Sequence, residues 1–299
     1  MKTRAVFSAR NTAFFAAALS LSLFPRVWAA GDIGRNNPAS KIYVSDITGE
    51  SQIAIGQKIE DLVKKSVYNV QGTIIETKAK SSDSLVYSNG TGVFFDAETR
   101  VEVRRFLQEP FTPNRTDMEV EPSVSQTQAY VLRGLVGICT SKLVAGSNMT
   151  YHTPHAMVNI RGRKLVIEAS DEITVISMIE GDSTVHGGAL DMGGRILRAG
   201  ERAVIQPGAP GQPNVVEIEK IPGDRLGQLE EKAAIACMAK RTVYFDTREN
   251  GEPAAGNLAN AFGGGNESTQ EIVAITVVPT NVSPDITISP STLPNPPPR

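Results

Sequence analysis

The chain of 299 residues has few of the side chains that usually perform chemistry, since it contains only three histidines, two cysteines and one tryptophan. Its charge is nearly balanced, with 30 Lys and Arg against 32 Asp and Glu. This balance argues against the broad basic surface that is typical of nucleic-acid binding. The sequence contains no Gly-x-Ser-x-Gly, phosphate-loop or dinucleotide-binding motif, so we expect neither a catalytic residue nor a cofactor.

Long apolar runs are also scarce, and the one from Ala13 to Phe24 stands near the start of the chain. Three basic residues precede this run, and Pro25 ends it. The run is shorter than the roughly 20 apolar residues that span a bilayer as a helix. The layout therefore predicts a secretory signal peptide over residues 1–29, cleaved near Ala29 or Ala30. We expect a periplasmic, secreted or cell-surface protein whose mature chain has no transmembrane segment.

Glycine and proline are plentiful, with 26 and 18 residues, whereas aromatic residues make up only 6% of the chain. Short β-branched runs, such as Thr73–Thr77 and Ile173–Ile179, are separated by turns that contain glycine. Many short strands at close spacing predict a mainly β fold, either β-solenoid-like or β-sandwich-like. No helix of crossover length interrupts the strands, which argues against a parallel βαβ fold.

The predicted organisation has five parts. They are a signal peptide (1–29), an N-terminal segment with a short helix (30–66), a β domain (67–207), an appendage of one strand and one helix (208–247) and a flexible tail rich in Pro, Gly and Asn (248–299). Both helices are predicted from apolar residues at helical spacing. These residues are Ile55, Ile59, Leu62 and Val63 for the short helix, and Leu226, Leu229, Ala233 and Ala236 for the second.

Several short motifs follow one another along the predicted β domain. They are Asn89-Gly90-Thr91, Thr153-Pro154-His155-Ala156, Ile160-Arg161-Gly162, Ser177 to Gly181 and Leu197 to Ala203. In this order they resemble the periplasmic domain of FecR-type bacterial envelope regulators, over residues 67–207. The resemblance implies a compact β domain in the cell envelope. It also implies structural roles for the residues that match the motifs, namely Thr153, Pro154, Arg161, Gly162, Gly181 and Gly200.

The chain also departs from the family pattern. Family regulators carry a cytoplasmic segment that controls a sigma factor, then a membrane helix, the β domain and a small domain that contacts a TonB-dependent receptor. Here the β domain follows the predicted signal peptide, without the cytoplasmic anti-sigma segment. Arg163 replaces the usual threonine, residues 109–128 read as an extra polar loop, and residues 215–280 do not match the receptor-contacting domain. We therefore expect the fold and the envelope location, without direct control of a sigma factor.

The histidines and cysteines allow alternative interpretations. His152, His155 and His186 are the candidates for a metal site, but a His-x-x-His pair lacks the further ligands that zinc sites require. We expect no bound metal, and a metal-dependent hydrolase that uses the three histidines is an alternative. Cys139 and Cys237 could form a disulfide in an oxidising compartment or pack as two buried thiols, and their spacing does not decide between these states.

Taken as a whole, the sequence predicts a non-enzymatic, exported FecR-domain protein that acts as a binding or scaffold module of the cell envelope. We expect its partner to be an envelope protein or a cell-wall glycan, contacted by exposed strand edges and the loop at residues 109–128. No nucleic-acid partner is expected. Another alternative is an envelope signalling component that contacts a TonB-dependent receptor through residues 215–280.

Overall fold

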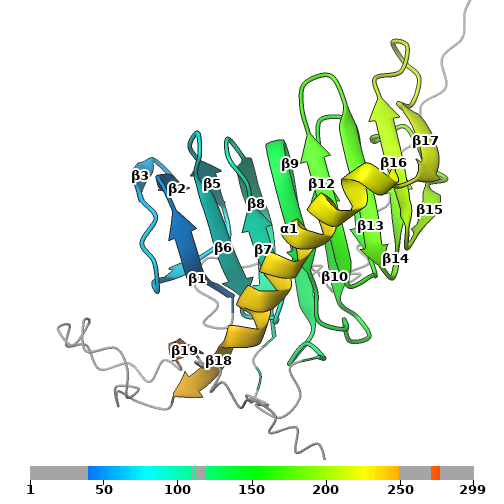
Figure 1. Ribbon diagram of the computed structural model, residues 1–299. Coiled ribbons are helices and arrows are strands. Elements are labelled where there is room, and N and C mark those ends of the chain that lie inside the picture. Colours follow the sequence, from blue (N-terminus) through cyan, green and yellow to red (C-terminus); the bar gives the residue numbers. More distant parts are fainter. Residues whose placement is uncertain (1–39, 110, 112–118, 249–270, 277–299) are drawn as a thin grey trace, which may run out of the picture. The chain divides into compact units, whose positions relative to one another are not determined.

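Seventeen strands form one continuous hydrogen-bonded array, which folds at strand β9 (Ser125–Cys139) into two layers (Figure 1). The computed structural model describes residues 40–109, 111, 119–248 and 271–276. The predicted signal peptide lies outside these ranges. No helix of the described residues has the length and apolar character needed to cross a membrane.

We call the two layers sheet A and sheet B. In spatial order, sheet A consists of β4 (Val67–Asn69), β1 (Lys41–Thr48), β6 (Ser82–Tyr87), β7 (Gly92–Phe95), the second part of β9, β12 (Lys164–Ala169), β13 (Thr174–Glu180), β16 (Glu201–Gln206) and β17 (Val215–Lys220). Sheet B consists of β3 (Lys58–Asp61), β2 (Ser51–Ile55), β5 (Thr73–Thr77), β8 (Arg100–Gln108), the first part of β9, β10 (Asn148–His152), β11 (Met157–Ile160), β14 (Asp182–His186) and β15 (Arg195–Arg198).

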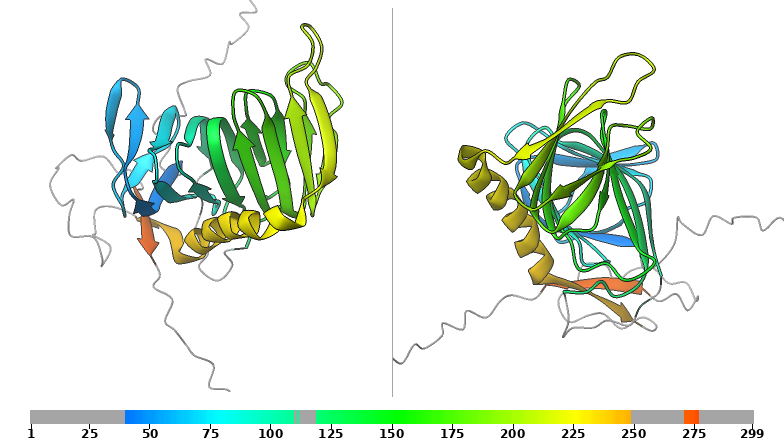
Figure 2. Two further views of the ribbon diagram at one scale, coloured as in Figure 1. Left: turned by 45° about the horizontal axis from the view of Figure 1, so that its top comes forward. Right: turned by 90° about the vertical axis from the view of Figure 1, so that its right-hand side faces the viewer.

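Beyond β9, the chain adds hairpins to the two layers in turn. The hairpin β10–β11 lies in sheet B, β12–β13 in sheet A, β14–β15 in sheet B and β16–β17 in sheet A. Strands β9 and β10 pair in parallel, and the other strand pairs of the two layers are antiparallel. The view along the layers in Figure 2 shows them face to face, with a helix outside one of them. This arrangement is the sandwich-like form of the mainly β fold that the sequence predicts.

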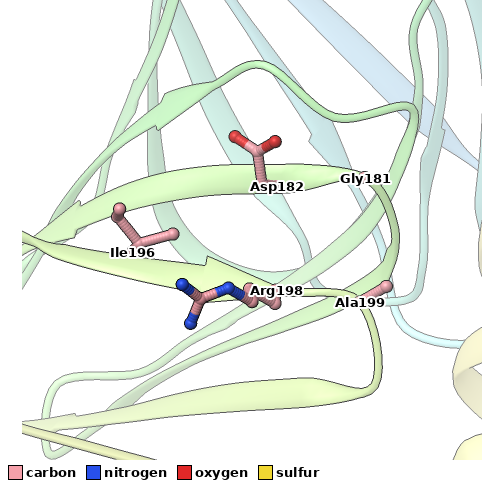
Figure 3. Close-up of a pocket in the computed structure, with 5 residues that line it drawn as sticks. All are labelled: Gly181, Asp182, Ile196, Arg198 and Ala199. Carbon is pink, nitrogen blue, oxygen red and sulfur yellow. The ribbon is translucent and has the colours of Figure 1, made fainter.

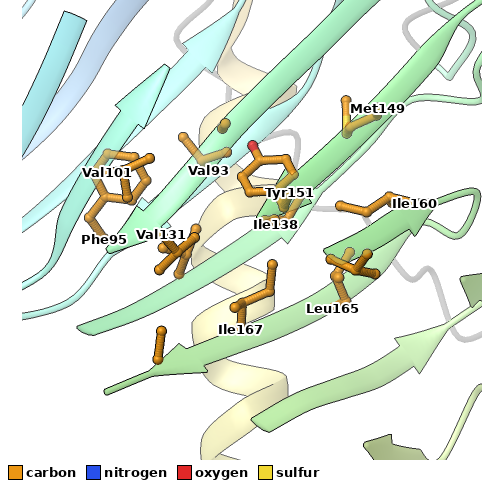
Figure 4. Packing of buried hydrophobic residues seen from close by; sticks show 14 of the residues in the cluster. Val93, Phe95, Val101, Val131, Ile138, Met149, Tyr151, Ile160, Leu165 and Ile167 are labelled. Atoms are coloured by element: carbon orange, nitrogen blue, oxygen red, sulfur yellow. The ribbon is translucent and has the colours of Figure 1, made fainter. Parts of the chain in front are cut away.

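The main hydrophobic core lies between the two sheets (Figure 4). Side chains alternate along each strand, so every second residue faces the other layer. Sheet A contributes buried residues such as Phe95 and Leu165, and sheet B contributes residues such as Val101 and Tyr151. Each fully buried Val, Leu, Ile or Phe side chain contributes about 1.5–3 kcal/mol through removal from water. The core is continuous through both layers, so the strands from β1 to β17 form one structural unit.

Helix α1 (Gly223–Thr242) covers the outer face of sheet A. Its buried residues include Leu229, Ala233 and Ala236, as the apolar spacing predicts. The helix approaches the sheet closely because glycines stand beneath it at Gly92 and Gly137. A Cβ atom at Gly137 would lie 2.7 Å from the carbonyl oxygen of Lys232, and one at Gly92 would overlap the carbonyl oxygen of Ala236.

A disulfide fixes the helix to the sheet. It joins Cys139 at the end of β9 to Cys237 of α1, with the two Cα atoms 5.1 Å apart and a sequence separation of 98. The structure thus decides between the two states that the cysteine spacing leaves open. After the helix, β18 (Val243–Arg248) pairs with β19 (Glu271–Thr276) in a separate two-stranded sheet.

The short helix predicted within residues 53–63 is wrong, because this segment forms the hairpin of β2 and β3. Gly56 adopts a φ of 62° at the turn, a conformation that glycine takes without a steric cost. Ile59 and Val63, which the prediction places on a buried helical face, are 67% and 54% exposed. Each of the two strands alternates inward and outward residues, and the turn between them shifts this alternation. The apolar residues of the two strands together therefore happen to have helical spacing.

Other predicted boundaries also change. The first strand of sheet A begins at Lys41 and that of sheet B at Ser51, both before the predicted domain start, and β17 belongs to sheet A instead of an appendage. Residues 125–128 of the predicted loop form the start of β9. Strand β19 lies in the segment predicted as a flexible tail, and the rest of that tail lies outside the described residues.

We expect Gly92→Ala to destabilise the fold by about 1–3 kcal/mol, because the new methyl group meets helix backbone and α1 must move outward. Urea unfolding followed by circular dichroism measures this change. The matched control is Gly227→Ala, since Gly227 is exposed in the helix and a Cβ there meets nothing within 4 Å. The control should stabilise the protein by about 0.5–1 kcal/mol. Equal effects of the two substitutions would contradict the close helix–sheet contact.

Removal of the disulfide by the double change Cys139→Ala and Cys237→Ala should lower the free energy of unfolding by about 2–5 kcal/mol, because it frees a closed loop of 98 residues in the unfolded chain. The same unfolding experiment on the unaltered protein, with and without a reductant, provides the comparison. The reductant should not change the free energy of unfolding of the double variant, whereas it should lower that of the unaltered protein. A reductant that leaves the unaltered protein unchanged would argue against the bond.

Candidate functional site

One hollow of the surface lies beside the ends of β14 and β15 (Figure 3). Its volume is about 610 Å³, and it is lined by Gly181, Asp182, Ile196, Arg198 and Ala199. The hollow is broad and open, with one acid and one base on its wall. Small-molecule sites usually bury most of their ligand within a concave pocket. This hollow lacks such enclosure, so a broader surface is the better candidate site.

The structure separates the three candidate metal ligands. His155 is buried at the turn between β10 and β11, where its Nδ1 lies 3.3 Å from the Thr174 hydroxyl. His152 and His186 lie on the outer side of sheet B, and Met157 of the intervening strand β11 stands between them. The described residues contain no group of three or more His, Cys, Asp or Glu side chains that could hold a metal ion.

The outer side of sheet B carries an uncharged patch over strands β9, β10, β11 and β14. We call this patch the polar face. Strand register places its residues in rows that cross the four strands. It consists of Gln126, Gln128 and Tyr130 on β9, Asn148, Thr150 and His152 on β10, Met157 and Asn159 on β11, and Thr184 and His186 on β14. All ten are exposed or half-buried, and none is Asp, Glu, Lys or Arg.

Hydrogen bonds within and between neighbouring strands hold the side chains of the polar face. The Thr150 hydroxyl lies 2.8 Å from Asn159 Oδ1 and 2.9 Å from Asn148 Oδ1. The amide nitrogen of Gln128 lies 3.1 Å from Nε2 of His152. Because the side chains stand on paired strands and contact one another, the face is a rigid array of donors and acceptors.

A stack of flat groups borders this array. The ring of His152 lies parallel to that of Tyr130, with centroids 4.5 Å apart, and the Arg104 guanidinium lies 3.8 Å from the centre of the Tyr130 ring. Burial, with a smaller contribution from the Arg104 charge, lowers the pKa of His152 below its ordinary value. The lowered pKa favours the neutral imidazole, and the Arg104 guanidinium is the charged member of the stack at the border of the polar face.

The charged residues beside the polar face form ion pairs with one another. On β5, Glu76 contacts Arg100, Arg133 and Lys78. Burial alone would raise the pKa of Glu76, but the hydrogen bond from Arg100 and the nearby positive charges lower it overall. One carboxylate faces three positive charges here, so this flank keeps a net positive charge beside the polar face.

The motif glycines meet where the chain passes between the two sheets. Gly162 lies on the connection from β11 to β12, and Gly181 lies on the connection from β13 to β14. A Cβ atom on Gly181, which has a φ of 96°, would overlap the Cα atom of Gly162. The two connections also share the hydrogen bond from the Arg163 amide to the Glu180 carbonyl, at 2.9 Å. Only glycine permits such an approach of two backbones.

The remaining motif residues lie at turns. Thr153 accepts hydrogen bonds through its hydroxyl from the amide of Ala156, at 2.8 Å, and from the Thr174 hydroxyl, at 2.9 Å. Pro154 follows it at the exposed turn, Arg161 has an exposed side chain after β11, and Gly200 lies between β15 and β16. The structure places the motif residues at corners of the scaffold and away from the polar face.

The sequence analysis misses the polar face. Gln126 and Gln128 fall in the segment that it reads as a loop, although alternation with Thr127 and Ala129 is a signal of a strand. Thr150 and Asn159 carry no motif, and only the strand register brings them beside Gln128. The one pattern in the sequence that indicates this face is the alternation of polar residues, which face outward, with buried residues along each strand.

Fold and site together define a two-layer β protein with one face covered by a helix and one open, uncharged polar face. No protein-family model matches the chain, and no curated protein matches it. Two crystal structures of a "putative anti-sigma factor" from Parabacteroides distasonis are similar to it, with TM-scores of 0.38 and 0.37 and 13% sequence identity. Each similarity covers 52% of this chain, and the chain spans 62% of the length of those structures.

One buried acid lies outside the polar face. Asp83 shares the inward side of β6 with Leu85 and Tyr87 and is 1% exposed. The Ser51 hydroxyl donates to its Oδ1 at 2.7 Å, and its Oδ2 has no hydrogen-bond partner among the described residues. Burial raises the pKa of Asp83 to about 6, against the smaller lowering effect of the Ser51 hydrogen bond. Asp83 is therefore a source of pH-dependent stability.

The folded protein should lose stability as the pH rises from about 4 to about 6, because the pKa of Asp83 is higher in the folded than in the unfolded chain. The loss from this residue is roughly 2–3 kcal/mol for a shift of about two pKa units. Urea unfolding between pH 4 and pH 7.5 measures it. Asp83→Asn, which keeps the size of the side chain, should lack this component. A variant with the same pH profile as the unaltered protein would refute the assignment.

Proposed function

We propose that the protein is an exported, non-catalytic binding module of the bacterial envelope, and that its polar face binds an uncharged polysaccharide. The observation that carries this proposal is the composition of the polar face, in which ten neighbouring residues on four adjacent strands include no Asp, Glu, Lys or Arg. Asp182, the next outward residue of β14, marks the limit of this face. The helix occupies the corresponding face of sheet A, so sheet B offers the open face.

The chemistry of these side chains suits a ligand rich in hydroxyl groups. Amides and hydroxyls each donate and accept hydrogen bonds, and a sugar hydroxyl requires partners of both kinds. Strands in a sheet lie about 4.8 Å apart, so a chain that crosses them meets a new polar side chain at each step. An anionic polymer would instead call for clustered Arg and Lys side chains.

Two features support the location. The N-terminal segment has the layout of a secretory signal peptide. The disulfide between Cys139 and Cys237 favours an oxidising compartment, because reducing compartments keep such thiols free. The resemblance of the β domain to envelope regulators agrees with the same location.

The proposal is tested with oligomers of N-acetylglucosamine, which have the uncharged chemistry of a cell-wall glycan backbone, by isothermal titration calorimetry. The double change Asn159→Ala and Thr184→Ala should weaken binding about tenfold, since each lost hydrogen bond contributes about 0.5–1.5 kcal/mol. Gln228→Ala, on the exposed side of α1, is the matched control and should bind as the unaltered protein does.

Two results would count against the proposal. One is the absence of heat or of co-sedimentation with insoluble uncharged glycans at every concentration tested. The other is binding that the control and the double variant share, because it would place the ligand elsewhere. Recovery of an envelope protein in place of a glycan, dependent on Asn159 and Thr184, would assign the face to a protein partner and refute the polysaccharide.

A further inference from the structure

Exposed apolar side chains gather at the two ends of the sandwich. Of the large apolar residues that are well exposed, only Met238 of α1 lies away from these ends among the described residues. Four belong to β2, β3, β4 and their connections: Ile55, Ile59, Val63 and Val67. Five belong to β15, β17 and the loop before β15: Leu190, Met192, Ile196, Val215 and Ile218. Such a distribution marks interaction surfaces better than single scattered residues do.

The same ends carry the unpaired strand edges. At one end, which we call the β3/β4 end, β3 pairs only with β2 and β4 only with β1. At the other, the β15/β17 end, β15 pairs only with β14 and β17 only with β16. Among the described strands none covers these outer edges. An open edge presents free backbone donors and acceptors to another chain.

We propose that the β15/β17 end of one copy docks on the β3/β4 end of the next copy, so that the protein assembles head to tail. Each end presents one edge of sheet A and one edge of sheet B. When the β15/β17 end of one copy contacts the β3/β4 end of the next, sheet A of the first copy therefore continues into sheet A of the second, and sheet B continues into sheet B. Every interface then covers the apolar residues of both ends at once.

Charges at the edges favour this pairing of unlike ends. On sheet B, β15 carries Arg198 in addition to Arg195, which already donates to the Val216 carbonyl, and β3 carries Asp61 in addition to Glu60, which already pairs with Lys58. Strand pairing between copies would bring these arginines beside the acid of the next β3 edge. Edge charges usually prevent pairing between like strands, and opposite charges direct it to a complementary edge.

The edges of sheet A have the opposite polarity. There β17 carries Glu217 in addition to Glu219, which already pairs with Arg202, and the segment before β4 carries Lys65 in addition to Lys64, which already pairs with Asp46. A direct meeting of two β15/β17 ends, with each sheet continuing its own kind, would place arginine against arginine and glutamate against glutamate. Contacts between unlike patches leave one end of each outer copy free, so they generate open rows, or rings where the rotation between copies closes.

The experiment uses the whole exported chain and two variants, each of which blocks one end. Ile59→Asp places a charge on the β3/β4 end, and Ile196→Asp places one on the β15/β17 end. The two side chains are 67% and 56% exposed, so neither change should alter the unfolding midpoint. Sedimentation equilibrium should show the mass of the unaltered protein rising with concentration and each variant remaining a monomer.

An equimolar mixture of the two variants decides the arrangement. The Ile59→Asp chain keeps a working β15/β17 end and the Ile196→Asp chain keeps a working β3/β4 end, so the mixture should form one-to-one dimers with a doubled mass. Met238→Asp, at the exposed residue on the helix, is the control and should assemble as the unaltered protein does. A mixture that stays monomeric, a single variant that still associates, or an unaltered protein that is monomeric at all concentrations overturns the proposal.

Discussion

The bend of strand β9 from one sheet into the other is the constraint on which the rest of the structure depends. Its first part pairs with β8 and β10 in sheet B, and its second part pairs with β7 and β12 in sheet A. The change of layer falls at Gly134, where φ is 94° and a Cβ atom would overlap Thr99. Because one strand sits in the middle of both layers, it sets the distance and the relative register of all the others.

The two outer faces follow from this arrangement in opposite ways. Sheet A has glycine at Gly92 and Gly137 and apolar neighbours around them, so a helix can lie against it and bury them. Sheet B has Gln, Asn, Thr and His at the equivalent outward positions, which remain stable in water without a cover. The asymmetry leaves one side packed against the helix and the other exposed to solvent.

The sequence predicts the parts of the fold that depend on local pattern. The helix of Leu229, Ala233 and Ala236 is predicted because its apolar residues recur within a single element. The hairpin around Gly56 is missed because two short strands joined by a turn can imitate helical spacing. The disulfide stays undecided at that stage, since Cys139 and Cys237 have a sequence separation of 98 and only the packing of α1 brings them together. The polar face is missed for the same reason, because its rows join four strands that are distant in sequence.

The bond between Cys139 and Cys237 also determines how the molecule would carry mechanical load. Tension applied to the chain beyond α1 enters the helix at its C-terminal end and passes through the sulfur atoms directly into β9. The hairpins from β10–β11 to β16–β17 belong to the segment between the two cysteines, which the disulfide bypasses. This segment therefore carries no tension while β9 bears the force. In a molecule held at its C-terminal side, the strands β10, β11 and β14 of the polar face would thus stay unloaded.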